Sequence, residues 1–301
     1  MENGFMGLAV KGIIPAMVTP LDRNEEIDEA GIRGIINYLI DSGVHGIFVC
    51  GSQGESYALT DDEKKRVIEI SVDEVNGRVP VYAGTGAVTT KMTIELSRYA
   101  VDVGADAVTI VTPYFIKPSQ DELYMHYKHI AESVDSPILI YNNPGRTNVN
   151  LEAETVKKLA EIDNIVGIKD SSGDLTLTAQ YIMKCPDEFA VLAGRDSLIL
   201  ETLLYGGKGA VAATANVAPR LVVGIYENFI KGDLEKAREL QFKILPLRLA
   251  FSLGTFPVVV KEAMNLMRKP SGPAKSPVSP LPEEKKRKLK LLLEELNLIS
   301  S

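Results

Sequence analysis

The sequence predicts an α/β fold, a (β/α)8 TIM barrel followed by a helical C-terminal extension, and three observations support this prediction. Eight short apolar runs recur at a spacing of about 25 residues, as the βα units of such a barrel do. The runs are apolar throughout instead of alternating with polar residues, which is typical of parallel strands buried on both faces. A helical pattern follows each run and supplies the crossover that parallel neighbours require.

The predicted elements follow one another in a regular order. The apolar runs predict strands over residues 12–17, 46–50, 79–83, 107–111, 137–141, 165–169, 190–193 and 209–213. The patterns between them predict helices over 28–42, 61–75, 90–103, 120–134, 152–161, 175–184, 197–205 and 217–231. Thr60 and Glu63 form a capping-box signal that starts the second helix, whereas Gly104 and Gly206 stand where helices should stop. An open doubly wound sheet is the alternative, but it would place a glycine-rich loop after the first strand, where residues 19–22 read Thr-Pro-Leu-Asp.

The pattern changes after Gly232, which divides the chain into a barrel, residues 1–232, and a C-terminal helical region, residues 233–301. Helices are expected over 233–253, 258–267 and 283–298 without strands between them. The segment 270–282 is rich in proline and serine, which indicates a linker or an ordered surface loop. Apolar residues recur at helical spacing in the first of these helices, so we expect the region to pack on the barrel flank.

The composition is typical of a soluble globular enzyme and argues against several other classes. The chain has 45% hydrophobic and 24% charged residues, a net charge of -7 and no basic stretch, which argues against a nucleic-acid partner. No apolar run reaches membrane-spanning length and no secretory leader precedes the barrel, so we expect a cytoplasmic protein without membrane association. The histidines lie away from the strand ends, so we expect no metal site.

Two residues at neighbouring strand ends could carry chemistry, because barrel enzymes build their sites at the carboxyl ends of the strands. Lys169 ends an otherwise apolar strand, and burial there disfavours the ammonium form of its amine. A neutral amine can form a Schiff base with a ketone. Tyr141 ends the adjacent strand and could relay the protons that this reaction requires. The structural alternatives are a lysine that reaches out to solvent and a tyrosine that fills space.

Two loops complete the candidate site. Residues 51–55, Gly-Ser-Gln-Gly-Glu, follow the second strand, and their glycines allow backbone N–H groups to converge on a small carboxylate. Ser52 in this turn could bond both the substrate and Tyr141, although a plain tight turn would have the same sequence. The loop around Arg195 opens the seventh helix, where barrels often hold phosphate, so a phosphorylated second substrate stays open.

These segments resemble the dihydrodipicolinate synthase / N-acetylneuraminate lyase family along nearly the whole chain. The resemblance lies in residues 51–56 (GSQGES), 141–147 (YNNPGRT), 167–173 (GIKDSSG) and 206–209 (GGKG). It implies a lyase in which Lys169 forms a Schiff base with pyruvate, Tyr141 shuttles protons, and Ser52 stands between Tyr141 and a neighbouring subunit. The family uses no metal or organic cofactor and typically forms a homotetramer, a dimer of dimers.

The resemblance also implies the substrate-binding residues. The turn of Ser52, Gln53 and Gly54 would hold the pyruvate carboxylate, and Val211 would line the pocket beside pyruvate. Arg146 matches the arginine that grips the carboxylate of the aldehyde substrate. Arg195 lies in the loop that faces this second substrate and is included in the binding set.

Four positions depart from the synthase pattern. Gln53 replaces a threonine, and Asn143 replaces an apolar residue. Arg195 stands where aspartate or asparagine is usual, and Phe115 replaces a tyrosine whose hydroxyl completes the proton relay across a dimer interface. A phenyl ring cannot pass a proton, so the Schiff-base half of the mechanism matches the family better than the half that handles the aldehyde.

The leading hypothesis is therefore a Schiff-base lyase that joins or cleaves pyruvate and an aldehyde, most like dihydrodipicolinate synthase. A 2-keto-3-deoxy sugar acid aldolase, or another lyase of this family, is the competing activity, since Phe115, Gln53 and Arg195 depart from the synthase. Outside this class, the alternatives are a non-catalytic small-molecule binder on the same barrel and a barrel enzyme that uses a metal or flavin.

Overall fold

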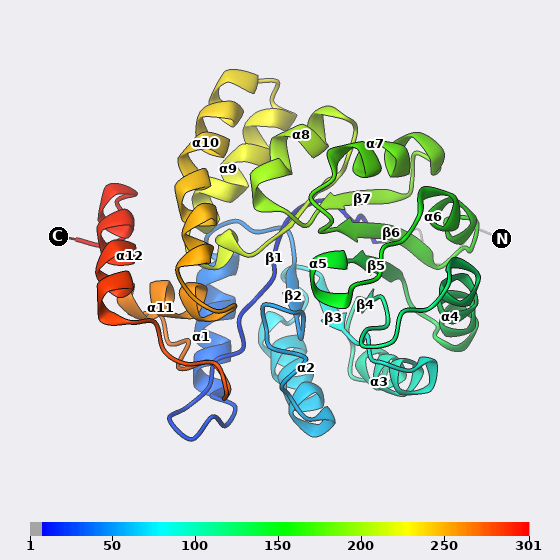
Figure 1. Ribbon diagram of the computed structural model, residues 1–301, viewed down its shortest axis with the longest axis horizontal. Coiled ribbons are helices and arrows are strands. Elements are labelled where there is room, and N and C mark those ends of the chain that lie inside the picture. Colours follow the sequence, from blue (N-terminus) through cyan, green and yellow to red (C-terminus); the bar gives the residue numbers. More distant parts are fainter. Residues whose placement is uncertain (1–7, 301) are drawn as a thin grey trace.

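The computed structural model describes residues 8–300 and contains a barrel of eight parallel strands (Figure 1). The strands are β1 Gly12–Pro15, β2 Ile47–Val49, β3 Val81–Gly84, β4 Ala107–Val111, β5 Ile138–Asn142, β6 Ile165–Asp170, β7 Ala190–Ala193 and β8 Gly209–Ala212. From β2 to β8 each strand pairs in parallel with the next one along the chain, and β8 pairs in parallel with β1. A bridge between Ala16 and Phe48 brings β1 beside β2, so the barrel is nearly closed. The predicted TIM-barrel fold is confirmed.

A helix follows every strand and covers the outside of the barrel. The barrel helices are α1 Glu29–Ile40, α2 Asp61–Val75, α3 Thr90–Asp102, α4 Gln120–Ser133, α5 Pro144–Thr147, α6 Ala153–Leu159, α7 Leu175–Lys184, α8 Ile199–Leu204 and α9 Pro219–Ile230, with short 3-10 turns η1 Asp196–Leu198 and η2 Thr214–Asn216. The expected helices agree with these bounds to within a few residues, except that α5 was not expected. It is a single turn that Pro144 opens at its first position, where a proline needs no donor.

The residues predicted to begin or end helices adopt the geometry expected of helix caps. The Glu63 N–H donates to Thr60 Oγ1 at 3.2 Å, and the Thr60 N–H donates to Glu63 Oε2 at 2.7 Å, so both halves of the capping box are made. Gly104 and Gly206, which follow α3 and α8, have φ angles of +98° and +103°. Side chains other than glycine rarely adopt such angles, which explains why glycine ends these helices.

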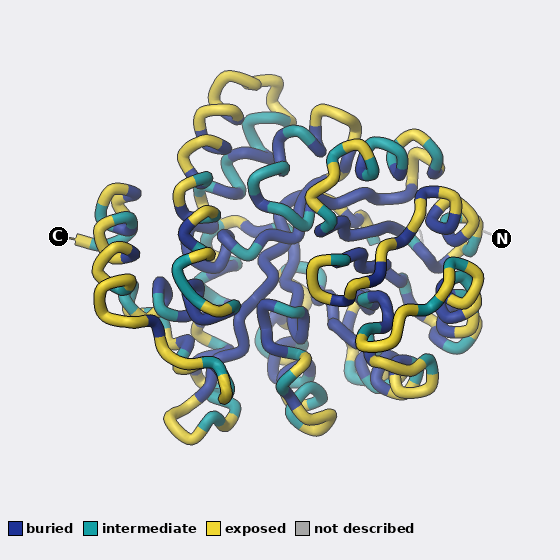
Figure 2. The backbone as a smooth tube through the Cα atoms, in the orientation of Figure 1, coloured by how far each residue is buried: buried dark blue, intermediate teal, exposed yellow. Residues whose placement is uncertain are grey.

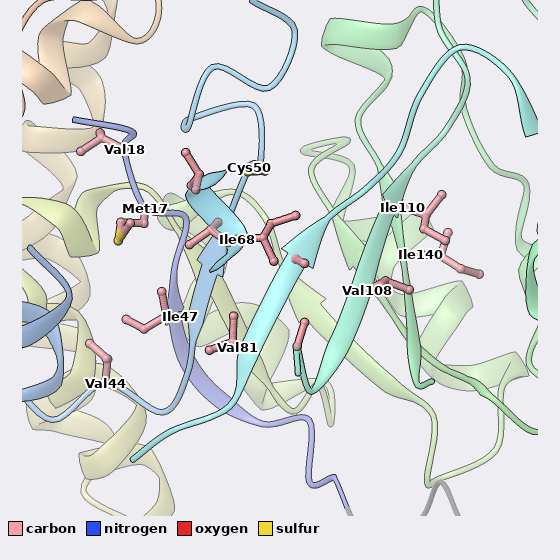
Figure 3. Packing of buried hydrophobic residues seen from close by; sticks show 14 of the residues in the cluster. Met17, Val18, Val44, Ile47, Cys50, Ile68, Val81, Val108, Ile110 and Ile140 are labelled. Atoms are coloured by element: carbon pink, nitrogen blue, oxygen red, sulfur yellow. The ribbon is translucent and has the colours of Figure 1, made fainter. Parts of the chain in front are cut away.

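The strands at the centre of the molecule are buried (Figure 2), and Figure 3 shows part of the apolar cluster that packs against them. The alternation of side chains along the strands decides which residues enter the barrel. Ile140 and Ile168 belong to the large apolar cluster between the sheet and the helices, together with Ile47, Val81 and Val108. Successive side chains of a strand point to opposite faces. The next residues, Tyr141 and Lys169, therefore point into the barrel.

The C-terminal region consists of α10 Leu234–Ala250, the 3-10 turn η3 Phe251–Leu253, α11 Val258–Leu266 and α12 Glu283–Glu295. Leu240 and Ile244 of α10 share an apolar cluster with Val222 and Ile225 of α9, which places α10 beside the last barrel helix (Figure 1). No single helix in the part of the chain that the structure describes is long and apolar enough to span a membrane. Residues 234–253 and 258–266 would meet such a length and composition test only as a pair bent by 118°.

Candidate active site

A cavity of about 930 Å³ opens at the carboxyl ends of the strands and collects most of the predicted site residues. Its lining includes seven of the eight residues that the sequence analysis selected: Ser52, Gln53, Tyr141, Arg146, Lys169, Arg195 and Val211. Gly54 lies beside them in the turn after β2 but does not line the cavity. Such a volume accommodates pyruvate together with a second small molecule.

Lys169 reaches this cavity from the end of β6 and is only 4% exposed. Its Nζ lies 3.9 Å from the centre of the Tyr141 ring and 4.8 Å from the centre of the Phe48 ring. No carboxylate of the described residues lies within ion-pair distance of this amine. A buried amine that faces aromatic rings and has no carboxylate partner is suited to react with a carbonyl group.

Tyr141 lies next to Lys169 because β5 and β6 pair in register at these two residues. Asn143 Nδ2 donates a hydrogen bond of 2.7 Å to its hydroxyl. Burial alone raises the pKa of Tyr141, but the Lys169 amine and the hydroxyls of Ser52 and Ser171 stabilise the phenolate more, so the net pKa is lowered from its ordinary value. A phenol with a lowered pKa is a better proton carrier near neutral pH.

The turn after β2 is compact and strongly constrained. A Cβ at Gly51 would lie 2.4 Å from the Phe48 ring, so only glycine fits there. Thr19 Oγ1 donates to the Gly54 carbonyl at 2.7 Å, and Glu55 adopts a left-handed φ of 59°. Both polar atoms of the Gln53 side chain are buried and have no partner among the described residues. Buried polar groups without a hydrogen-bond partner lower the stability of the fold, and a ligand, a water molecule or another chain often provides the missing partner.

A buried ion pair joins this turn to the C-terminal region. Lys261 Nζ of α11 lies 2.5 Å from Glu55 Oε1, and both side chains are 1% exposed. Lys261 also donates to the Pro273 carbonyl, and the Lys275 N–H donates to Glu55 Oε2 at 2.8 Å. Residues 270–282, expected as a linker or an ordered surface loop, are thus ordered where they contact the turn.

Arginines line the outer part of the cavity. Arg146 lies in α5, with its guanidinium carbon 4.3 Å from the centre of the Phe256 ring. Arg195 Nε donates to the Ser171 carbonyl at 3.0 Å. Burial lowers the pKa of Arg195, and the positive charges of Arg248 and Arg146 act in the same direction. The cavity therefore has a strongly positive mouth.

Three residues of the cavity were missed by the sequence analysis as site residues. Ser171 follows Lys169 by two positions and faces Tyr141. Asn143 was noted only as a departure, although its amide bonds the Tyr141 hydroxyl. Arg248 lies in the last turn of α10, in a region expected only to pack on the flank. The expected apolar spacing of α10 gave no sign that its end returns to the barrel mouth.

The three histidines, His45, His126 and His129, lie outside the cavity lining. Across residues 8–300, no group of three or more histidine, cysteine or acidic side chains is arranged to hold a metal ion. His45 bonds Glu227 at 3.2 Å, and His126 bonds Thr90 at 2.9 Å.

Phe115, where the family places its relay tyrosine, is 91% exposed with a φ of 76°. It does not line the cavity of the single chain.

Comparison with known proteins shows which family the chain is similar to. The model of the dihydrodipicolinate synthetase family matches residues 9–296. The chain is 46% identical to 4-hydroxy-tetrahydrodipicolinate synthase of Methanopyrus kandleri, over 98% of this chain and 99% of the relative. It is 44% identical to the enzyme of the same name from Methanocaldococcus jannaschii, over 96% and 99%. A prophage protein from Escherichia coli K12, solved in complex with pyruvate, superimposes with a TM-score of 0.94 at 36% identity, covering 97% of this chain and all of the other. As the resemblance in the sequence predicted, the chain belongs to the dihydrodipicolinate synthetase family.

Proposed function

We propose that this protein is a class I lyase that joins or cleaves pyruvate and an aldehyde through a Schiff base on Lys169. The observation that carries the proposal is the buried, carboxylate-free amine of Lys169 directly against Tyr141. The relatives named 4-hydroxy-tetrahydrodipicolinate synthase and the pyruvate complex of a structural neighbour support the same chemistry.

In the synthetic direction, the Lys169 amine attacks the ketone carbon of pyruvate and forms a carbinolamine. Tyr141 protonates the departing hydroxyl, water leaves, and a protonated imine remains. The Tyr141 phenolate takes up a methyl proton, which gives an enamine. The enamine carbon attacks the aldehyde carbon and forms the new bond, and the aldehyde oxygen receives the proton from Tyr141 and becomes a hydroxyl. Water then hydrolyses the imine and regenerates the amine. The turn of Ser52, Gln53 and Gly54 holds the pyruvate carboxylate, and Val211 packs beside it.

The proposed activity is most like that of 4-hydroxy-tetrahydrodipicolinate synthase. Arg146 lines the same cavity as Ser52 and Gln53 and would bind the carboxylate of an acidic aldehyde such as aspartate semialdehyde, since guanidinium and carboxylate form strong paired bonds. We further propose a cytoplasmic homotetramer, a dimer of dimers. The exposed Phe115 and Tyr57, 91% and 51% exposed, provide apolar surface for contact between subunits.

A 2-keto-3-deoxy sugar acid aldolase is the second candidate. Four features favour it: Phe115 has no hydroxyl, Gln53 replaces a threonine, Asn143 bonds Tyr141, and Arg195 replaces an acidic or amide residue. All four leave Lys169 and Tyr141 in place.

Borohydride trapping with pyruvate tests the proposal. Intact-mass and peptide analysis should find a reduced pyruvyl adduct on Lys169 in the wild type and none in Lys169→Ala. An unmodified wild-type chain would reject Schiff-base chemistry and favour a non-catalytic binder. Parallel assays with aspartate semialdehyde and with 2-keto-3-deoxygluconate then separate the two activities, because only the matching substrate should turn over efficiently.

A further inference from the structure

Asn143 contacts the hydroxyl of Tyr141 directly. It follows Tyr141 by two positions, is buried at 8% exposure, and lines the cavity. Its Nδ2 donates a hydrogen bond of 2.7 Å to the Tyr141 hydroxyl. Among the described residues that line the cavity, Tyr141 is the only tyrosine. The Asn143 amide is therefore bonded to the group that carries the protons in the proposed mechanism.

The Asn143 side chain stands at the start of α5, where asparagine usually has a different task. A side chain at this position commonly accepts a backbone N–H group of the first helical turn. The Asn143 side chain makes no such bond. The turn is held by the Asn143 backbone carbonyl, which accepts the N–H groups of Arg146 and Thr147 at 2.9 and 3.0 Å. The side chain is thus free of the helix and is directed to Tyr141.

The surroundings of the amide favour its nitrogen on the Tyr141 side. A Cβ at Gly145 would lie 3.9 Å from Asn143 Oδ1 and 3.8 Å from Arg195 Nη2, so the amide oxygen and the guanidinium face the same space. The positive charge of Arg195 attracts the oxygen and leaves Nδ2 towards Tyr141. The amide nitrogen donates and cannot accept, whereas a serine hydroxyl can do either. Asn143 is therefore a permanent donor to the Tyr141 oxygen.

A permanent donor acts differently on the two forms of a phenol. It leaves the O–H of the neutral phenol free to point at the reacting atoms, and it forms a stronger, charge-assisted bond once that proton has been given up. In the proposed mechanism Tyr141 gives a proton to the departing hydroxyl and then takes one from the methyl group. The phenolate between these two steps is the species that the Asn143 amide stabilises.

We propose that Asn143 is a positioning residue for the proton relay, which fixes the Tyr141 hydroxyl beside Lys169 and holds the phenolate between successive proton transfers. The inference rests on the proposed lyase function and adds a residue that acts through Tyr141. The pairing of β5 with β6 fixes the backbone of Tyr141 beside Lys169, and the amide fixes the far end of its ring. The ring is thus held at both ends.

Asn143→Leu tests this role, because leucine has nearly the shape of asparagine and no donor. Ultraviolet titration of this variant against the same variant with Tyr141→Phe isolates the ionisation of Tyr141. Its midpoint should rise by about one pH unit or more relative to the wild type, as expected when a hydrogen bond to a charged group is lost. Near neutral pH, kcat should fall about tenfold with the phenolate population, while the KM for pyruvate should change by less than about twofold.

Asn143→Asp is a second variant with the shape of the amide and the opposite chemistry. Its carboxylate accepts the phenol proton and repels the phenolate, so the midpoint should rise further than in Asn143→Leu. Thr147→Val is the matched control. It removes a buried hydroxyl that donates to the Asn143 carbonyl at 3.1 Å, which loosens the same turn and leaves the amide on Tyr141. Thr147→Val should unfold more easily and keep the wild-type midpoint.

Two results overturn the role of Asn143: a midpoint that does not move in Asn143→Leu, or an equal shift in Thr147→Val. Borohydride trapping with pyruvate on the same samples keeps this outcome apart from failure of the lyase function. A wild-type adduct on Lys169 together with an unmoved midpoint rejects the positioning role alone. An absent wild-type adduct rejects the Schiff base itself, and with it the relay.

Discussion

Two buried lysines, one in the barrel and one in the C-terminal region, show how the same side chain is used in opposite ways. Lys169 ends a strand, is 4% exposed, and faces the rings of Tyr141 and Phe48. Lys261 lies on α11, is 1% exposed, and pairs with Glu55 at 2.5 Å. A buried lysine without a carboxylate is available for covalent chemistry, whereas a buried lysine with one is fixed as a structural link.

Replacing Lys169 should cause the largest loss of activity, and it tests whether Lys169 differs from Lys261 in having no structural role. Lys169→Met should lower kcat/KM by on the order of 10⁴-fold or more, because the covalent intermediate is lost. The variant should fold at least as stably as the wild type, since methionine removes an amine that is buried without a carboxylate. Steady-state kinetics and urea unfolding measure the two effects. A clear loss of stability would show that this lysine is structural as well.

Replacing Lys261 should affect stability more than activity, the reverse of replacing Lys169. Lys261→Met leaves the Glu55 carboxylate buried and unpaired, which should lower the free energy of unfolding by about 3–5 kcal/mol. The KM for pyruvate should rise as well, because Glu55 belongs to the turn that holds the carboxylate. The double variant Glu55→Gln, Lys261→Met should recover most of the stability. Lys275→Met is the control, since its pair with Glu63 is more exposed, at 16% and 17%, and its loss should lower the free energy of unfolding by less than loss of the Lys261–Glu55 pair.

Tyr141→Phe removes a proton carrier while keeping the ring beside Lys169. The value of kcat should fall by about 10²-fold or more, within the range for a general acid–base group. The pKa of Tyr141 is lowered from 10.0, so the limb of the wild-type pH–rate profile that reports its ionisation should lie below pH 10 and vanish in the variant. A limb that persists in the phenylalanine variant would assign the proton transfers to another group.

His126 offers a third buried basic group, which is kept neutral. Burial lowers its pKa from 6.5 to about 4. The unfolded chain binds this proton near pH 6.5 and the folded chain near pH 4, so stability is highest above pH 6.5 and falls as the pH drops towards 4. The loss should be about 3 kcal/mol. Unfolding measured across this range should show a weaker pH slope in His126→Gln. His129→Gln, at an exposed position, should weaken the slope less, because burial lowers the pKa of His126 more than the charge of His129 does.

The barrel and the inward position of Tyr141 and Lys169 were predictable because both depend on local periodicity. Apolar runs fixed the strands, and strand alternation decides that Tyr141 and Lys169 face inward. Lys261 was not predictable in this way, because a lysine in an isolated helix pattern indicates a solvated position. Its burial results from the segment around Pro273, which folds back over it and accepts its hydrogen bond. The role of Arg248 depends on the path of the chain after α10, which no short pattern in the sequence specifies.

The link between Glu55 and Lys261 also has a consequence for synthesis on the ribosome. All eight strands, and with them Lys169 and Tyr141, emerge once residue 212 has left the exit tunnel. Glu55 then has no cationic partner until α11 follows, a delay on the order of a few seconds at ordinary elongation rates. The nascent barrel therefore holds Lys169 before the turn of residues 51–55 is locked, and we expect the proposed reaction to begin only after α11 has been synthesised.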